Sequence, residues 1–353
     1  MRFQPLLIKR KYRARDKPVA RKNLIGSGSI LEKSLWLPAA AYPSRTAFEQ
    51  MAGSDMTILR VNHLTRYAYR RPVGFGQHRL MFRPRDSYDQ RLISSELKIS
   101  PEPSDIFWIH DAFGNCVACA DFDSLADALC FETTIVLDHT PQHSPHFRAD
   151  EDAKTWPFQY DNETSPDLRP SMHRQYPDDV TETWARRFVN PLGPTKTATI
   201  LESMTHAIKN DFRYNRRTNP GTQTPEMTLY SLSGTCRDFA LLMMEAVRSL
   251  GFAARFVTGY IYAPARDTGE NLGGGATHAW VQVFVPGAGW VEFDPTNGII
   301  GNRDLIRVGV TRDPRQAIPL WGTHTGSRID SLGMTVQVNV TSVGVKDAPT
   351  IIT

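Results

Sequence analysis

The sequence predicts an α+β protein in which an all-β, sandwich-like domain precedes a domain of helices followed by an antiparallel sheet. Three patterns predict this fold class: alternation of apolar and polar residues from Thr57 onward, helical spacing of apolar residues between 180 and 250, and renewed alternation after Ala254. The chain has 353 residues, which is long for a single core, so we expect two domains.

The first 55 residues differ in composition from the rest of the chain. They hold eleven Lys and Arg against four acidic residues, a charge of +7, whereas the remainder carries −3. Because this segment has scattered prolines and no periodicity, we predict that residues 1–55 are a disordered basic extension and that the functional protein starts near Met56. The competing interpretation of the basic run is a tether to nucleic acid or membrane.

The charge and the cysteine content narrow the class of protein. A nearly neutral body argues against a nucleic-acid-binding surface, because phosphate contacts need concentrated Lys and Arg. No run approaches the roughly 18 apolar residues of a membrane-spanning helix. Four cysteines do not indicate a disulfide framework in a chain of this size, and reduced thiols suit the cytosol. We therefore expect a cytoplasmic protein with neither nucleic-acid nor membrane partners.

Residues 56–140 are predicted to form the all-β domain. Thr65, Tyr67 and Tyr69 alternate with polar or small residues, as on a strand with one covered face. Turn residues at 111–115 separate two later strand-like runs. Runs of this kind cover Gln77–Arg83, Leu92–Ser100, Ile106–His110, Cys116–Phe122 and Glu132–Asp138. Several short strands separated by turns favour a sandwich.

The second domain is assigned to residues 171–345, after a linker at 141–170 that holds five prolines, and residues 346–353 form a tail. Helical spacing is clearest after Cys236, where Gly251 has the position of a helix-terminating glycine. The apolar stripe of this helix consists of Phe239, Leu242, Met243, Ala246, Val247 and Leu250. Strands are expected over Ala254–Tyr262, His278–Val285, Trp290–Asp294 and the alternating run Met334–Thr341.

Cys236 stands at the start of that helix. Thr235 has the position of the N-cap and Asp238 the third helical position, which is the pattern of a capping box. The partial positive charge at a helix N-terminus favours the thiolate, the reactive form of cysteine. A lone cysteine at a helix start is more often structural than catalytic, so the interpretation depends on its partners.

His278 and Asp294 are the expected partners of the cysteine. They lie on successive predicted strands, and their side chains share a face only if the connecting loop is odd in length or contains a bulge. A three-residue loop, Pro286–Ala288, pairs Val285 with Gly289. His278 and Asp294 then become diagonal neighbours with their Cβ atoms about 7 Å apart, which is close enough for a hydrogen bond between the side chains. The cysteine would then be the nucleophile, His278 the base and Asp294 the residue that orients the base.

Two further features complete the predicted site. The backbone N–H of Cys236 would supply one donor of an oxyanion hole. The sequence does not identify the second donor, for which a side chain of the segment Phe212–Gln223 is one candidate. The glycine-rich loop Ala263–Ala276 precedes His278 and is interpreted either as a mobile cover or as a long surface connection.

Three motifs surround the candidate residues: Gly234–Ala240 at the cysteine, Thr277–Val281 at the histidine and Gly289–Gly298 at the aspartate. With them, and with His63–Tyr69 and Asp111–Asn115 in the β-rich region, the chain resembles the bacterial transglutaminase-like family over about residues 57–345. The resemblance implies a papain-like, transglutaminase-like core and acyl transfer from an amide through a thioester.

We expect a peptidase or amidase that attacks a peptide or side-chain amide and passes the acyl group to water. The alternative is a protein-glutamine gamma-glutamyltransferase, in which a lysine amine replaces water, and the alternative of another class is a non-catalytic binding module on the same scaffold. An arylamine acetyltransferase shares the residue order, but no Arg-Gly-Gly precedes Cys236. We expect a peptide or protein substrate, no cofactor and no metal, because Cys116 and Cys119 would lie on opposite faces of a strand.

Overall fold

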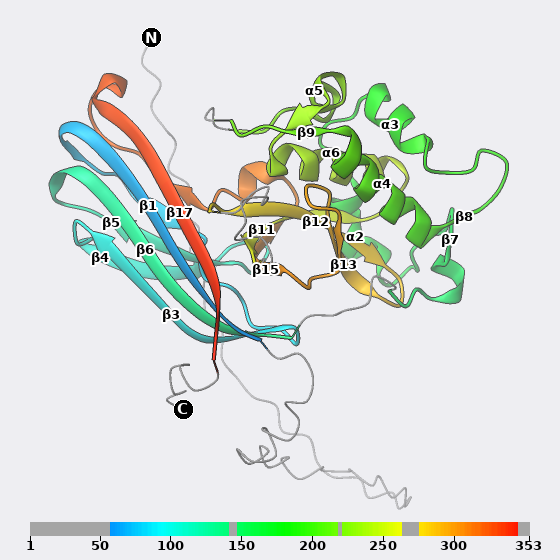
Figure 1. Cartoon of the computed structure of the whole chain (residues 1–353), viewed down its shortest axis with the longest axis horizontal. Helices are drawn as coiled ribbons and strands as arrows, with labels where there is room; N and C mark the ends of the chain where they lie inside the picture. The colour runs from blue at the N-terminus through cyan, green and yellow to red at the C-terminus, as the bar shows by residue number, and fades with distance from the viewer. Residues whose placement is uncertain (1–56, 141–146, 218–220, 263–274, 345–353) are drawn as a thin grey trace, which may run out of the picture. The chain divides into compact units, whose positions relative to one another are not determined.

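The computed structural model describes residues 57–140, 147–217, 221–262 and 275–344, which all fall within one compact unit, Ala52–Thr353. The predicted basic extension, the tail and the glycine-rich part of the predicted cover loop at 263–274 lie outside the described residues. The α+β class is confirmed, and the N-terminal strands and the later helices and strands follow the predicted order (Figure 1). None of the helices in the described ranges is both long and apolar enough to cross a membrane.

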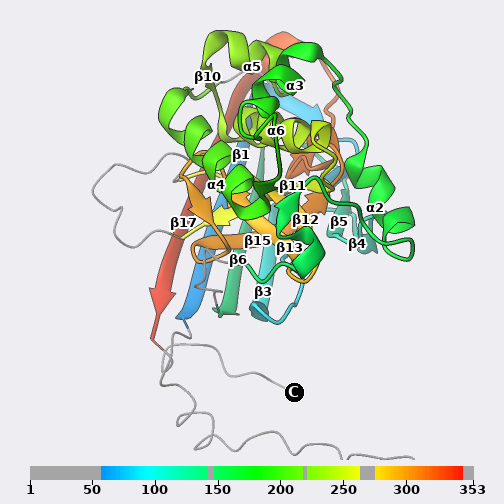
Figure 2. The same ribbon diagram turned by 90° about the vertical axis from the view of Figure 1, so that its right-hand side faces the viewer.

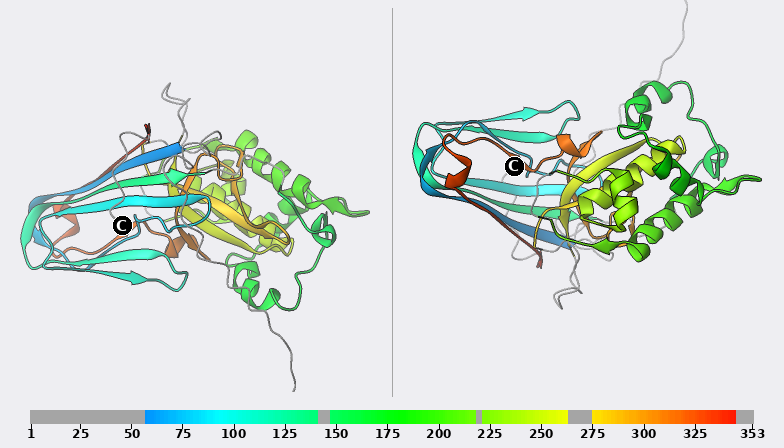
Figure 3. Two further views of the ribbon diagram at one scale, coloured as in Figure 1. Left: turned by 90° about the horizontal axis from the view of Figure 1, so that it is seen from below. Right: turned by 90° about the horizontal axis from the view of Figure 1, so that it is seen from above.

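The N-terminal region is a sandwich of two four-stranded antiparallel sheets, which lie as separate layers in Figure 3. One sheet has the order β17-β1-β6-β3, formed by Ser331–Val343, Thr57–Gly74, Leu125–His139 and Gln90–Ser100. The other has the order β16-β2-β5-β4, formed by Leu320–Trp321, His78–Leu80, Cys116–Asp121 and Asp105–His110. Apolar side chains from both sheets, among them Tyr69, Leu80 and Phe131, fill one core between the layers.

The last strand belongs to this sandwich and not to the second domain, which corrects its predicted place in the antiparallel sheet of the second half. β17 pairs with β1 from Ile58 opposite Val343 to Tyr69 opposite Ser331. Alternation of apolar and polar residues predicts a strand with one covered face, but it does not identify the strand that hydrogen-bonds to it. The end of the chain therefore returns to the sheet in which the described chain begins.

The predicted linker is wrong for its described part, residues 147–170. Trp156 lies in β7 (Thr155–Trp156), pairs with β8 (Thr195–Lys196) and donates its indole N–H to the carbonyl of Leu250 at 2.7 Å. Phe147 and Phe158 also pack against the core of the second domain, and the helix α2 (Ser165–Met172) follows. Prolines limit regular secondary structure, but they do not prevent a segment from packing.

The second domain consists of helices on one face of a five-stranded antiparallel sheet of order β14-β13-β12-β11-β15 (Figures 1 and 2). The strands are β14 (Ile299–Ile300), β13 (Gly289–Asp294), β12 (His278–Val285), β11 (Ala254–Ile261) and β15 (Leu305–Thr311). The helices are α3 (Asp179–Arg186), α4 (Thr197–Asp211), α5 (Pro225–Ser231) and α6 (Cys236–Ser249). Short strands β9 (Arg213–Tyr214) and β10 (Ser233–Gly234) pair in parallel just before α6.

Helix α6 is the centre of this domain. Its predicted apolar stripe is buried, and α3, α4 and α5 also contact the helix. Glu245 and Arg248, which lie off the stripe, are buried as well, because Glu245 accepts from the backbone of Gln175 and Tyr176 and Arg248 donates to the carbonyl of Ser171. Arg248 Nη1 lies 2.8 Å from Glu245 Oε1, and this ion pair compensates the two buried charges. Gly251 has φ +90° directly after the helix, a conformation that favours glycine, so the predicted helix end is confirmed.

Candidate functional site

Cys236 is the first residue of α6 and is nearly buried, with 7% of its surface exposed. The predicted capping box is present: the Thr235 hydroxyl accepts from the backbone N–H of Asp238, and the Asp238 carboxylate accepts from the backbone N–H of Thr235 at 2.8 Å. The cap satisfies backbone donors at the helix start and fixes the backbone that carries the thiol.

Asp238 has a second role that the sequence pattern did not indicate. Both of its carboxylate oxygens accept hydrogen bonds at 3.0 Å from the guanidinium of Arg217, and one also accepts from the backbone N–H of Gln223 at 2.7 Å. One buried carboxylate therefore caps the helix and holds two residues of the preceding loop beside Cys236.

His278 and Asp294 meet as predicted. Val285 pairs with Gly289, so the connection is the three-residue loop Pro286–Ala288, and the register places the two side chains on one face of the sheet. His278 Nε2 lies 2.8 Å from Asp294 Oδ2, and both side chains are fully buried. The geometric condition deduced from the loop length is satisfied.

Two neighbours that the sequence did not single out hold the Asp294 carboxylate. The backbone N–H of Thr296 donates to Oδ1 at 2.9 Å, and the Asn297 side-chain amide donates to Oδ2 at 2.7 Å. Both residues follow Asp294 in the turn after β13. A short polar turn directly after the aspartate is the sequence feature that could have identified them. These two hydrogen bonds hold the carboxylate in the orientation in which it contacts the imidazole.

The electrostatics favour a charged imidazole. Burial alone lowers the pKa of His278, but the charge and hydrogen bond of Asp294 and the contact with the Cys236 thiol raise it to about 10. Burial raises the pKa of Asp294, whereas His278, Asn297 and Thr296 lower it, with a net result below the usual range. The pair is therefore an imidazolium and a carboxylate at neutral pH.

The second ring nitrogen of His278 completes the arrangement. His278 Nδ1 is buried and has no hydrogen-bond partner among the described residues, and the Cys236 thiol lies close enough to the ring to raise its pKa. One edge of the imidazole thus faces a carboxylate and the ring also contacts a thiol. A group held in this way can exchange a proton with sulfur while its charge is stabilised from the other side.

Tyr214 lies in the segment that is one candidate source of the second oxyanion donor. It pairs with Gly234 through the short β9–β10 ladder, two residues before Cys236. Burial, and next the negative charge of a Cys236 thiolate, raise the pKa of its phenol, while Arg216 lowers it. The phenol is thus a neutral O–H close to the sulfur.

A pocket of about 580 Å³ opens beside Cys236, and the N-terminal sandwich forms one of its walls. Strand β1 contributes His63, Thr65 and Tyr67, and β17 contributes Met334 and Val336. The rest of the lining comes from the start of α6, the segment 314–322 and five further residues, namely Phe82, Arg217, Gly221, Thr222 and Thr277. The wall was not predicted, because its formation depends on strands that are far apart in sequence.

His63 is part of this wall and not a second base. Its Nδ1 lies 3.0 Å from the Tyr260 hydroxyl and its Nε2 lies 3.0 Å from the Thr65 hydroxyl. Burial lowers its pKa to about 4, so the ring is neutral at physiological pH. Within the described parts of the chain, no group of three or more His, Cys, Asp or Glu side chains could hold a metal ion.

Two family models match the chain. The model of the bacterial transglutaminase-like N-terminal region matches residues 59–138, and the model of the transglutaminase-like superfamily matches residues 182–295. This chain belongs to the bacterial transglutaminase-like family. The second match contains Cys236, His278 and Asp294, and membership supports a cysteine-based enzyme.

Relatives of this transglutaminase-like protein occur in mycobacteria. An uncharacterised protein of Mycobacterium bovis is 28% identical over 295 residues, which cover 79% of this chain and 91% of the relative. A Mycobacterium leprae protein is 37% identical over 112 residues, 31% of this chain and 39% of that protein. A candidate cysteine protease from Cytophaga hutchinsonii has a similar fold, with a TM-score of 0.61 and 19% identity over 83% of this chain and 92% of that chain.

Proposed function

We propose that the protein is a cysteine-nucleophile acyl-transfer enzyme, most simply a peptidase or amidase, with Cys236, His278 and Asp294 as its catalytic triad. The observation that carries the proposal is the buried imidazole of His278, which contacts the Asp294 carboxylate at 2.8 Å and also the Cys236 thiol. A histidine that only stabilises a core needs one hydrogen-bond partner. It needs neither a carboxylate held in place by other donors nor a thiol at the start of a helix.

These positions support the following reaction. The Cys236 thiolate attacks the carbonyl carbon of an amide, and the C–N bond breaks as the His278 imidazolium gives its proton to the leaving amine. The resulting thioester is attacked by water, which loses a proton to the now neutral imidazole, and the acid and the thiolate are released. Asp294 stabilises the imidazolium in both half-reactions but does not take up the proton.

The developing oxyanion requires two donors. The backbone N–H of Cys236 is one of the free donors at the start of α6. The Tyr214 phenol, a neighbour of the sulfur, is our candidate for the second. Loss of one oxyanion donor costs about 10²- to 10³-fold in turnover, so a Tyr214→Phe variant that keeps full turnover would remove Tyr214 from this role.

The pocket beside Cys236 supports a peptide or protein substrate. It is formed largely by apolar and aromatic side chains of both domains, and its volume of about 580 Å³ accommodates a substrate side chain next to the scissile amide. All four cysteines are free, and reduced thiols suit the cytosol, which supports a cytoplasmic location as part of the proposal.

A peptide-library digest followed by mass spectrometry tests the proposed reaction. Wild-type protein should release free acids from peptide or glutamine amides and form an acyl adduct on Cys236, and Cys236→Ala should do neither. Cys130→Ala is the matched control, because this half-buried cysteine lies in the sandwich. Isopeptide products with an added lysine amine would instead indicate the gamma-glutamyltransferase, and the absence of both products and of the acyl adduct from the wild type would indicate a binding module.

A further inference from the structure

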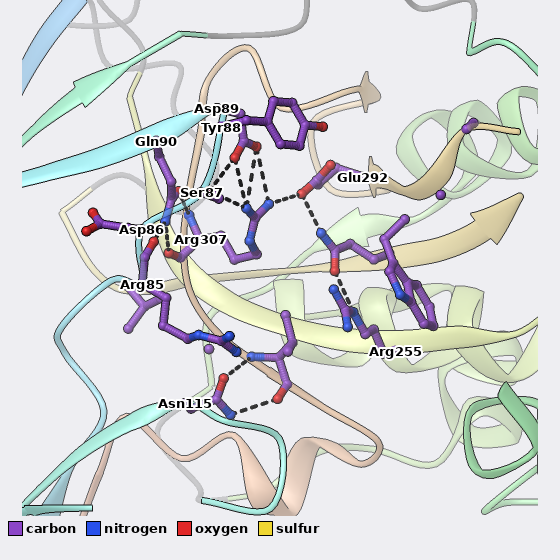
Figure 4. A pocket seen from close by; sticks show the side chains of 17 residues that line it. Arg85, Asp86, Ser87, Tyr88, Asp89, Gln90, Asn115, Arg255, Glu292 and Arg307 are labelled. Atoms are coloured by element: carbon purple, nitrogen blue, oxygen red, sulfur yellow. Dashed lines mark hydrogen bonds and ion pairs between the residues drawn. The ribbon is translucent and has the colours of Figure 1, made fainter. Parts of the chain in front are cut away.

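A second pocket, of about 400 Å³, lies on the face of the five-stranded sheet that is turned away from α6 (Figure 4). Val281, Val283 and Phe293 pack toward α6, so their strand neighbours Gln282 and Glu292 point to the opposite face. The loop at 85–90 from the sandwich forms the other side of the pocket. The pocket is separate from the one that contains Cys236.

Arg307 binds both buried carboxylates of this pocket through one guanidinium group, so these three groups together keep one net negative charge. Its guanidinium donates to Asp89 Oδ1 at 3.1 Å and to Glu292 Oε1 at 2.6 Å (Figure 4). The third carboxylate, that of Asp86, accepts from the backbone N–H of Leu92 and points away from the arginines. Among the described residues, none of these carboxylates forms an ion pair with a second cation.

Arg255 is a second cation of the pocket, and it makes no direct contact with a carboxylate among the described residues. Its Nε donates to the Gln282 side-chain oxygen at 2.6 Å, and its guanidinium lies over the ring of Trp290, 4.1 Å from the centroid. In the described part of the chain its two terminal nitrogens have no hydrogen-bond partner and it forms no ion pair. Burial, and next the charge of Arg307, lower the pKa of Arg255 to about 10, although the charge of Glu292 acts in the opposite direction, so the guanidinium charge is only partly compensated.

Arg85 adds a third guanidinium, so the arginines exceed the two buried carboxylates of the pocket by one charge. Its guanidinium donates to the backbone carbonyl of Phe113 at 3.2 Å and forms no ion pair among the described residues. It is also close enough to Arg255 for the two charges to repel, since Arg85 contributes to the lowered pKa of Arg255. Three guanidinium groups therefore converge on a pocket whose two buried carboxylates are both bound by one of them.

We propose that this pocket binds the carboxylate of a small organic acid, with the terminal nitrogens of Arg255 as its main donors and Arg85 beside them. The planar fork of a guanidinium matches a carboxylate with two parallel hydrogen bonds, and Trp290 and Gln282 hold the fork of Arg255 in place. A single negative charge fits better than a dianion, because Asp89 and Glu292 repel additional charge. The exposed ring of Tyr88 lines the pocket and offers a surface for an apolar body.

The proposed donors lie apart from the nucleophile, although Glu292 of the pocket is two residues from Asp294 along β13. Arg255 pairs with Gln282, four residues along β12 from His278, which is about 13 Å at 3.3 Å per residue. A ligand there does not need a functional nucleophile, so the proposal can be tested in protein that carries Cys236→Ala. Its failure and the failure of the proposed activity are therefore distinguishable.

Benzoate is the probe, because it combines a monovalent carboxylate with an aromatic body. Isothermal titration at constant ionic strength, with sodium chloride as the reference salt, should give one saturable site, and benzoate should raise the melting temperature. Arg255→Met should weaken binding by about tenfold or more and remove the shift in melting temperature. Arg186→Met, an exposed arginine of α3 paired with Glu182, is the control and should bind benzoate like the wild type.

Arg85→Met provides a second variant should Arg255→Met fail to fold, and it should also weaken benzoate binding. Equal stabilisation by chloride, unchanged binding in a folded Arg255→Met or Arg85→Met variant, or tighter binding of inorganic phosphate than of benzoate would each overturn the proposal. Arg255→Lys refines the test, because it keeps the charge but removes the fork, and it should bind more weakly than the wild type.

Discussion

Replacement of Asp294 by asparagine tests the contact between the carboxylate and the imidazole. The variant keeps the shape of the side chain and an oxygen for the Thr296 N–H, but it loses the charge that faces His278. The side-chain amide would then direct a donor at the protonated Nε2, so two donors would face each other. Both side chains are fully buried, so solvent does not screen the loss.

The magnitude follows from the burial of the pair. Breaking a buried ion pair costs about 3–5 kcal/mol, and each 1.36 kcal/mol in a barrier is tenfold in rate, so kcat/KM should fall by about 10²- to 10⁴-fold. Without the carboxylate, burial dominates and lowers the pKa of His278, so the alkaline limit of activity should move to lower pH. The assay is kcat/KM against pH for wild type and Asp294→Asn on one amide substrate.

The same pair contributes to stability in a definite pH window. Because the pKa of folded His278 is raised from 6.5 to about 10, its contribution is complete below pH 6.5 and is lost as the pH rises through about 10. Asp294 has a lowered pKa, so its contribution is present above its ordinary pKa and is lost on acidification. Denaturant unfolding should show a loss between pH 6.5 and 10 that is absent in Asp294→Asn. Unchanged kinetics and an unchanged pH profile in this variant would refute the reasoning.

Three other predictions concern the supporting structure. Gly259→Ala should destabilise the protein by several kcal/mol, since a Cβ there would lie 2.0 Å from the Ile306 carbonyl oxygen; melting of Gly193→Ala, whose Cβ has an ordinary contact, is the control. Asn115→Ala should cost about 1–3 kcal/mol in denaturant unfolding, because its side chain makes both hydrogen bonds to the backbone of Val310; a loss within error would contradict this. Asp238→Ala should lower the melting temperature and turnover together, because it removes the helix cap and the partner of Arg217; unchanged turnover would show that the loop does not need this anchor.

The parts of the molecule that could be predicted from sequence depend on local rules. The cap at Thr235, the stripe of α6 and the loop after Val285 each depend on residues a few positions apart, and the loop length alone fixes whether His278 reaches Asp294. A change of one residue in strand register moves every side chain to the other face of the sheet. One loop of odd length was therefore sufficient to predict a contact across two strands.

The parts that could not be predicted depend on partners that are distant in sequence. β17 has a clear alternating pattern, yet its pairing with β1 joins residues 58 and 343, and nothing in either pattern encodes that choice. The pocket wall beside Cys236 follows from this pairing, since it combines side chains of both strands. The prediction of a linker at 147–170 is wrong for a related reason. Trp156 contacts the end of α6 at Leu250, which is 94 residues later in the sequence.

The central claim is that Cys236, His278 and Asp294 act as one unit, and the rate of cysteine alkylation tests it most directly. Iodoacetamide labelling, followed site by site by peptide mass spectrometry, should modify Cys236 much faster than the half-buried Cys116 and Cys130. In His278→Ala this selectivity should disappear, although the protein remains folded. Equal labelling of the three cysteines in the wild type, or selective labelling that persists without His278, would contradict the account.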